Sequence, residues 1–354
     1  MIKGLGDEKL ENWRGGELEK WMKTIILIVI MILSSLSVAH ARDIRVLILD
    51  KRFSTTPDTE TTIKKIGNFK GELLVSGVRY LGNIEIWKGE KGLYLINEVP
   101  LEDYVRSVVL SEVADGWEME ALKAQAVIVR TYAVKYIQKG TNRLYHLTSS
   151  TLHQLYRGDN SDSGVSYAVM QTRGEILTYN GEPIEAFYHS TCGGKTEFAE
   201  EVFGRAYPYL KSVSSDCSIS SYWIWQRRLS SRKIEKKLGL SGLKDIRITS
   251  YTKSGRVKEL TFITENGTRV IPSKDLRRFL GWKTLPSTWF SLRKKGNTFI
   301  FDGKGYGHGV GLCQWGAQQM AKNGKTYKEI LSFYYPGTVI KLDDKFMPLS
   351  QKKE

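Results

Sequence analysis

Cysteine, proline and acidic side chains are scarce in this sequence. Its 354 residues include 3 cysteines and 8 prolines, and 53 lysines and arginines outnumber 38 aspartates and glutamates, which gives a formal net charge of +15. No proline-rich linker, internal repeat or low-complexity tract divides the chain. The hydrophobic content of 41% is ordinary for a globular protein and excludes wholesale disorder.

Several enzyme signatures are missing too. The chain has no H-E-x-x-H helix and no G-x-S-x-G elbow, which argues against a zincin protease and an α/β-hydrolase. Its glycine-dense segment, Gly305–Gly311, matches neither the Walker A spacing nor the dinucleotide fingerprint. Because glycine permits close backbone approach, we expect this segment to lie against a ligand.

The N-terminal hydrophobic run is too short to cross a membrane comfortably. Ile25–Leu33 has nine residues, whereas a transmembrane helix needs about 20. A lysine precedes the run, and Ala39–Ala41 has the A-x-A form of a cleavage site, so the pattern predicts a signal peptide within residues 1–41. We expect translation to start at Met22 and the mature chain at Arg42. The alternative is an uncleaved anchor, and no cysteine adjoins the cleavage site to carry a lipid.

Export to a periplasm or cell wall limits the partners that the positive charge can attract. Anionic wall polymers or lipid headgroups are available there, whereas nucleic acid is not. A membrane would be reached only through an uncleaved signal. The alternative for each basic cluster is a solvated surface without a dedicated ligand.

The remaining patterns predict an α+β fold, with mixed helices and antiparallel strands that are grouped rather than alternating. Apolar runs between glycine turns predict a small β-rich unit over residues 42–98. One helix is expected to open at Pro100 and a second to span about Glu118–Gln138. Further strands are expected at Glu175–Tyr179, Ile184–Tyr188, Ile246–Tyr251, Val257–Thr264 and Thr298–Phe301, and further helices at Arg232–Leu240, Lys274–Leu280 and Gln314–Lys322.

One carboxylate of the first helix has the position of a general acid. Glu112 continues the apolar stripe of Val105 and Val108 by helical spacing. Burial on that side of a helix end would raise the pKa of the carboxyl group, as general acid catalysis requires. The alternative is a glutamate that caps the helix or pairs with a basic neighbour.

Four segments in this order resemble the SpoIID/LytB family, named for stage II sporulation protein D and the amidase enhancers. They are VPLEDYVRSVVLSE at 99–112, EALKAQAVIVRTYA at 120–133, FYHSTCGGKTE at 187–197 and GYGHGVGLCQWGA at 305–317, and Tyr334–Gly337 completes the usual ending. The resemblance covers roughly residues 99–340. It implies a SpoIID-like domain over 99–345, followed by a polar tail at 346–354.

The resemblance implies peptidoglycan as the substrate and lytic transglycosylation as the reaction. Members of this kind cut the glycan strand between N-acetylmuramic acid and N-acetylglucosamine and leave a 1,6-anhydro sugar. The family's catalytic glutamate falls on Glu112, although many members have Glu-Met-Pro where this chain has Glu-Val-Ala. One carboxylate can suffice, because it protonates the leaving oxygen and then takes the proton of the sugar's own C6 hydroxyl, whereas hydrolysis normally needs two.

The matching segments also supply candidate substrate contacts. These are Gln125, Arg130, Tyr132, His189, His308 and Gln314. The alternative for each is a structural role within its segment. A histidine in the position of His189, taken alone, is more often packed and hydrogen-bonded than catalytic.

The sequence leaves two hypotheses for the three cysteines, a disulfide or a metal site. No cofactor is required, and the His/Cys cluster that binds zinc in some family members is incomplete here, since His146 and His153 remain without the expected cysteines. In an oxidising compartment Cys192 and Cys217 could form a disulfide, which leaves Cys313 as a buried thiol. Alternatively all three cysteines, with His189 nearby, could form a soft metal site.

Two other functions compete with the transglycosylase. The chain could be a non-catalytic wall-binding partner that stimulates an N-acetylmuramoyl-L-alanine amidase, as the amidase enhancers are described. It could also be a module that binds another polysaccharide. The presence of Glu112 favours the enzyme, because a pure activator would not need this carboxylate.

Overall fold

The computed structural model describes residues 42–52, 63–89, 92–113, 116–140, 144–150, 153–158 and 162–343. The predicted signal peptide and the predicted tail at 346–354 lie outside these residues. The described residues form a mixed α+β fold with several small sheets, as the sequence predicts. None of the helices in this part of the chain combines the length and the apolar character that crossing a membrane requires.

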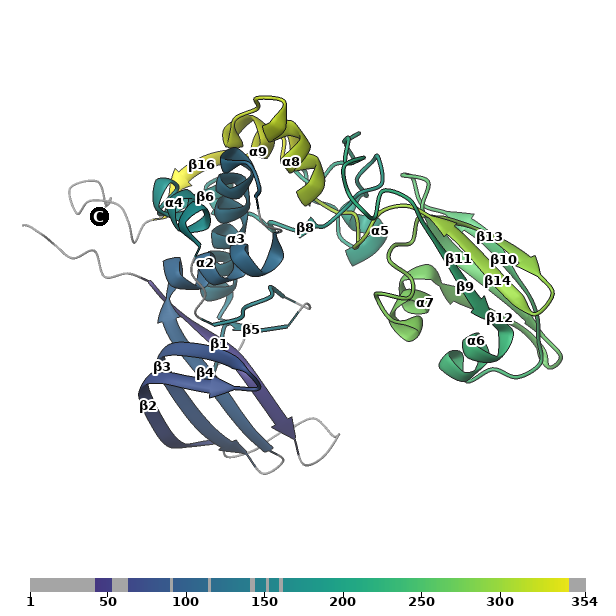
Figure 1. Ribbon diagram of the computed structural model, residues 1–354, viewed down its shortest axis with the longest axis horizontal. Helices are drawn as coiled ribbons and strands as arrows, with labels where there is room; N and C mark the ends of the chain where they lie inside the picture. Colours follow the sequence, from purple (N-terminus) through teal and green to yellow (C-terminus); the bar gives the residue numbers. More distant parts are fainter. Residues whose placement is uncertain are drawn as a thin grey trace, which may run out of the picture. The chain divides into compact units, whose positions relative to one another are not determined.

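The predicted N-terminal strands form an antiparallel sheet (Figure 1). The sheet has the strand order β2-β3-β4-β1-β5, and the last strand pairs parallel to β1. Its strands are β1 (Asp43–Arg52), β2 (Lys64–Val75), β3 (Val78–Gly89), β4 (Gly92–Pro100) and β5 (Leu147–Thr148). Ile44 and Ile84 are fully buried in the same cluster as residues of the following helices, so the sheet and the helices share one core.

Two helices carry most of that core. Helix α2 (Leu101–Glu112) begins directly after Pro100 with acidic residues in its first turn, where the helix dipole favours them. Helix α3 (Met119–Lys139) is buried almost all round from Ala121 to Val134, which places it at the centre of the fold. It ends at Gly140, whose φ of 55° is left-handed.

The two later family segments meet beside these helices. Strand β8 (Tyr188–His189) pairs parallel with β15 (Leu312–Cys313), so that chain segments far apart in sequence lie side by side. The C-terminal elements that complete this core are α8 (Gln314–Lys322), α9 (Tyr327–Tyr334) and β16 (Val339–Leu342). The other elements around it are α4 (Ser163–Gln171), β6 (Glu175–Tyr179), β7 (Glu182–Pro183) and α5 (Ala199–Phe203).

The strand predicted at Ile184–Tyr188 is wrong for most of its length. The predicted turn is present, because Asn180 and Gly181 both have positive φ and join β6 to β7. The ladder stops at Pro183, which has no N–H group to donate. Only Tyr188 of the predicted strand lies in a strand, and its partner is β15.

A second hydrophobic core lies within residues 225–301. Its elements are β9 (Trp225–Ser230), α6 (Ser231–Leu238), β10 (Leu243–Tyr251), β11 (Val257–Thr264), β12 (Gly267–Pro272), α7 (Ser273–Leu280), β13 (Phe290–Lys295) and β14 (Thr298–Gly303). The strands form two sheets of three, β10-β11-β12 and β13-β14-β9. Buried Phe262, Phe299 and Phe301 belong to this cluster and not to the larger one. The sequence predicts the hairpin and both helices but not a separate core.

Candidate active site around Glu112

Glu112 ends helix α2 and is held by hydrogen bonds from two other segments. The backbone N–H of Leu155 donates to its Oε1 over 3.0 Å, and the hydroxyl of Tyr188 donates to the same oxygen over 3.4 Å. The side chain is partly exposed. The carboxylate is therefore held in position in a residue that is buried only in part.

The surroundings of Glu112 favour its protonated form. Burial raises the pKa of Glu112 from 4.5, while hydrogen bonds from Leu155 and Tyr188, the nearby side-chain amide of Gln314 and the charge of Arg157 oppose the rise. The net shift is upward. A carboxyl group that keeps its proton closer to neutral pH is suited to protonating a leaving oxygen.

Tyr188 is part of a buried polar network. A hydrogen bond to Gln154 lowers the pKa of Tyr188, although burial dominates and leaves that pKa well above 10.0. The hydroxyl of Tyr104 donates to Gln154 Oε1 over 2.9 Å, and Gln154 Nε2 donates to the carbonyl of Val129 over 3.4 Å. The network connects Tyr188 to helices α2 and α3.

The side chains of Gln314 and Gln125 are buried and carry amide atoms without a hydrogen-bond partner within the described residues. Gln314 begins α8 directly after β15, lies close enough to lower the pKa of Glu112, and its Nε2 has no hydrogen-bond partner within the described residues. Gln125 of α3 is 1% exposed, and neither amide atom has a partner there. An unsatisfied buried polar group costs about 1–3 kcal/mol. A bound substrate or ordered water would remove this cost.

The two predicted histidines form a second polar pair. Their ring centroids are 5.6 Å apart, and both interact with the backbone of Val310. His189 Nδ1 donates to the carbonyl over 3.1 Å, and the N–H donates to His308 Nδ1 over 3.0 Å. Burial lowers the pKa of His308 to about 4 and that of His189 well below 6.5, so both are neutral at neutral pH.

Arg130 and Tyr132 are placed inside the protein. The guanidinium of Arg130 is fully buried and makes a bidentate pair with Glu102, at 2.8 and 2.7 Å. It also donates to two backbone carbonyls. Tyr132 stacks on Tyr136 with a centroid distance of 4.6 Å. For Arg130 these contacts favour the structural alternative.

The glycine-dense segment lies against the protein's own backbone, where a ligand was expected. A Cβ on Gly311, whose φ is 72°, would lie 2.0 Å from the carbonyl oxygen of Phe187. One on Gly307 would lie 2.8 Å from the Cβ of His189. The glycines thus permit the third and fourth family segments to pack together, which positions Tyr188 and Gln314.

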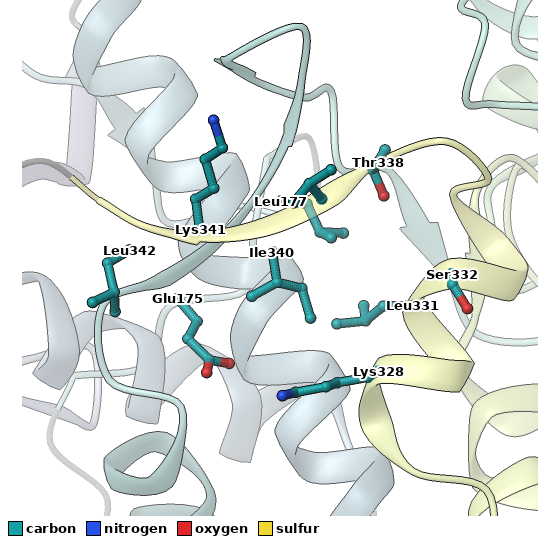
Figure 2. A pocket seen from close by; sticks show the side chains of 10 residues that line it. Glu175, Leu177, Lys328, Leu331, Ser332, Thr338, Ile340, Lys341 and Leu342 are labelled. Atoms are coloured by element: carbon teal, nitrogen blue, oxygen red, sulfur yellow. The ribbon is translucent and has the colours of Figure 1, made fainter.

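A surface hollow of about 550 Å³ lies elsewhere, between β6, α9 and β16 (Figure 2). Its lining includes Glu175, Lys328 and Ile340, and none of the predicted site residues. It therefore contributes nothing to the site around Glu112.

The two histidines of the incomplete zinc cluster are engaged separately. His146 Nδ1 accepts the N–H of Arg45 over 3.0 Å, and His153 Nδ1 accepts that of Thr148 over 3.2 Å. The predicted disulfide is not formed in the structure, since Cys192 and Cys217 are free thiols with sulfurs 3.3 Å apart. Cys313 is a buried thiol.

The sequence reasoning missed Tyr188, Gln154, Leu155 and the exposed Arg157. Tyr188 adjoins the chosen His189, and neighbouring residues of a strand point to opposite faces, so only one of them could face Glu112. That alternation was a usable signal. The other three lie in a stretch without regular structure, where no periodicity identifies a functional side chain.

Comparisons with known proteins identify relatives of this chain. The profile of a family described as stage II sporulation protein matches residues 89–179, and a domain of unknown function matches residues 210–311, which include the second core. An uncharacterized protein of Brachyspira hyodysenteriae is 38% identical over 75% of this chain and 73% of its own length. Stage II sporulation protein D of Bacillus subtilis is 35% identical over 71% of this chain and 77% of its own. The amidase enhancer of Bacillus subtilis is 30% identical over 67% of this chain and 40% of its own.

Proposed function

The chain belongs to the SpoIID/LytB family, and on this premise we propose that it is an exported lytic transglycosylase of peptidoglycan with Glu112 as its acid and base. The observation that supports this most is the state of Glu112, a carboxyl group whose pKa burial raises and whose Oε1 is held by Leu155 and Tyr188. The proposed place of work is a periplasm or cell wall.

The proposed reaction moves one proton out of Glu112 and one back. Protonated Glu112 donates to the glycosidic oxygen between N-acetylmuramic acid and N-acetylglucosamine as that bond breaks. The carboxylate then takes the proton of the C6 hydroxyl of the muramyl sugar, whose oxygen bonds to C1. The product is a 1,6-anhydro end, no water is consumed, and the enzyme regains its starting state.

The neighbouring residues have roles in this proposal. Tyr188 and the Leu155 N–H keep the carboxyl group in one orientation, while the unpartnered side-chain Nε2 of Gln314 binds a polar group of the glycan. The rings of Trp117 and Trp315 lie 5.4 Å apart, and the second follows Gln314 directly in sequence. Such a partly buried aromatic pair offers an apolar face for a sugar ring.

Product analysis tests the proposal. The protein and its Glu112→Gln variant are incubated with purified glycan strands, with and without stem peptides, and released fragments are identified by mass spectrometry. We expect 1,6-anhydromuramyl ends from the wild type and from a Glu118→Gln control, which removes an exposed carboxylate six residues along. Absence of product from the wild type on both kinds of strand would contradict the proposal.

A second candidate function is stimulation of an amidase. The relative described as an amidase enhancer, matched over 67% of this chain, supports it. This function predicts that the protein binds glycan, accelerates an N-acetylmuramoyl-L-alanine amidase, and does so equally well as the Glu112→Gln variant. Adding an amidase to the assay therefore separates the two functions.

A further inference from the structure

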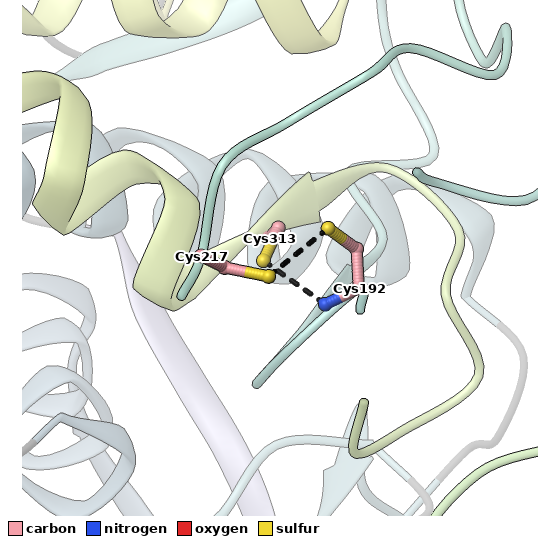
Figure 3. Close-up of side chains that lie close together, drawn as sticks. All are labelled: Cys192, Cys217 and Cys313. Atoms are coloured by element: carbon pink, nitrogen blue, oxygen red, sulfur yellow. Dashed lines mark hydrogen bonds between the residues drawn. The ribbon is translucent and has the colours of Figure 1, made fainter. Parts of the chain in front are cut away.

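The three cysteines of the chain converge on one buried point (Figure 3). Cys192 follows β8, Cys217 lies in a loop before the second core, and Cys313 lies in β15. Their sulfur atoms all lie within 4.8 Å of one another, and their side chains are at most 1% exposed. Within the described residues, no other group of three or more histidine, cysteine, aspartate or glutamate side chains brings its ligand atoms this close together.

Backbone N–H groups point at these sulfur atoms. Cys313 Sγ accepts from the N–H groups of Cys192 and Gly316, at 3.1 and 3.4 Å, and Cys192 Sγ accepts from Gly194 at 3.3 Å. A thiolate accepts hydrogen bonds more strongly than a neutral thiol, so these donors would stabilise the thiolates that form when a metal ion binds. Cys313 also caps the N-terminus of α8, where the helix dipole favours a negative charge.

A buried cation is already placed beside the group. The guanidinium of Arg256 is 2% exposed and donates to the carbonyl oxygens of Cys192 and Lys195, each at 2.8 Å. This one positive charge would offset part of the negative charge that the three sulfurs acquire when they bind a metal ion.

A disulfide accounts for less of this arrangement. It needs a sulfur separation of about 2.0 Å and would use two of the three cysteines. A disulfide between Cys192 and Cys217 would leave out Cys313. The two backbone N–H groups that donate to Cys313 Sγ would then have no role in it. A metal ion uses all three sulfurs, and three thiolates about 2.3 Å from one ion lie about 4 Å from one another.

We infer that Cys192, Cys217 and Cys313 form a binding site for one thiophilic d10 metal ion, Zn(II) or Cu(I). Each thiol releases a proton to solvent as its sulfur binds the metal, and no oxidant or reductant takes part. Three sulfurs suit a three-coordinate Cu(I) ion, whereas Zn(II) would complete its coordination with a fourth, oxygen ligand. The inference does not depend on the proposed transglycosylase.

The site would hold the catalytic segments together. Cys192 lies four residues after Tyr188, and Cys313 directly precedes Gln314. Cys217 leads into the second core, which begins at Trp225. A bound metal would therefore fix the two segments that carry Tyr188 and Gln314.

Metal stoichiometry tests the inference. The full chain is purified under a phosphine reductant, loaded with Zn(II) alone or Cu(I) alone, freed of excess metal, and analysed by mass spectrometry of the elements. We expect one ion per chain for at least one metal and a rise in melting temperature on loading. A Cys217→Ser variant should bind the metal ion with an apparent affinity at least tenfold lower than that of the wild type.

A relocated thiol is the matched control. The double variant Cys217→Ser, Ser218→Cys keeps three thiols but moves one to an exposed neighbouring position, and we expect it to bind as poorly as Cys217→Ser. Equal binding by wild type and the relocated variant would overturn the inference. So would a wild-type chain that binds neither metal after full reduction, an outcome that needs no variant to fold.

Discussion

The hydroxyl of Tyr188 lies 3.4 Å from Oε1 of Glu112, although 76 residues separate them in the chain. The contact exists because β8 pairs with β15 beside the end of α2, and the pairing itself depends on glycines that permit close backbone approach. Tyr188, which the sequence did not single out, thus holds Glu112, which it did.

The first prediction concerns this contact. Tyr188→Phe removes a hydrogen bond that lowers the pKa of Glu112, so the pKa should rise further and the alkaline limb of the activity profile should move to higher pH. Since the bond also orients the carboxyl group, we expect kcat to fall about tenfold to a hundredfold. The pH dependence of glycan cleavage measures both effects.

The matched control for that variant is Tyr167→Phe, at an exposed tyrosine of α4. It should leave the profile and kcat unchanged. An unchanged limb in Tyr188→Phe would show that the hydroxyl does not act on Glu112.

The second prediction concerns stability and pH. The folded protein holds the proton of Glu112 more tightly than the unfolded chain does, because burial raises the pKa above 4.5. The resulting stability is complete below the unfolded value and is lost as pH rises through the folded value. Glu112→Gln, which stays neutral, should therefore melt at a higher temperature than the wild type near pH 7, and the difference should vanish in acid. A melting series over pH checks this, and an equal offset at every pH would contradict it.

The third prediction separates structure from substrate binding at Arg130. Its removal leaves the Glu102 carboxylate without its partner, so Arg130→Ala should lower the free energy of unfolding by about 3–5 kcal/mol. Lys325→Ala breaks an exposed pair with Glu329 and should cost under about 1 kcal/mol. Urea denaturation measures both. A stable Arg130→Ala protein with a raised KM would instead support substrate contact.

The fourth prediction concerns Gly311. Gly311→Ala places a methyl group against the carbonyl of Phe187, and we expect a loss of about 3 kcal/mol or more together with loss of activity. Gly324 has a similar φ of 78° with nothing within 4 Å, so Gly324→Ala should cost only about 1–2 kcal/mol. Equal costs would mean that backbone strain, and not contact with the Phe187 carbonyl, explains the glycine.

Local sequence signals predicted the fold well where one segment determines its own structure. Acids after Pro100 and an apolar stripe predicted α2, and Glu112 continues that stripe. The wrong strand at Ile184–Tyr188 shows the limit, because apolar composition does not reveal where a partner strand ends. The second core was missed for a related reason, since which hydrophobic residues meet depends on tertiary contacts.

The site was predictable to a similar extent. Periodicity placed Glu112 on the apolar stripe of its helix and the family resemblance suggested its role, but Leu155 contacts it through a backbone N–H, which no side-chain pattern encodes. The segment Gly305–Gly311 packs against other parts of the chain and not against a ligand. Glycine in a sequence indicates that something approaches the backbone closely, but not whether it is a ligand or another segment. Likewise the sequence left a disulfide and a metal site open for the three cysteines, because it does not show that their sulfurs lie within 4.8 Å of one another.

The fate of water during cleavage tests the central claim most directly. Glycan strands are cleaved by the protein in water enriched in heavy oxygen, and the new muramyl ends are weighed by mass spectrometry. The account predicts anhydro ends without heavy oxygen, formed by the wild type and lost in Glu112→Gln. Ends that carry one added, labelled water would mean hydrolysis, and would contradict a mechanism in which Glu112 returns its proton from the sugar's own C6 hydroxyl.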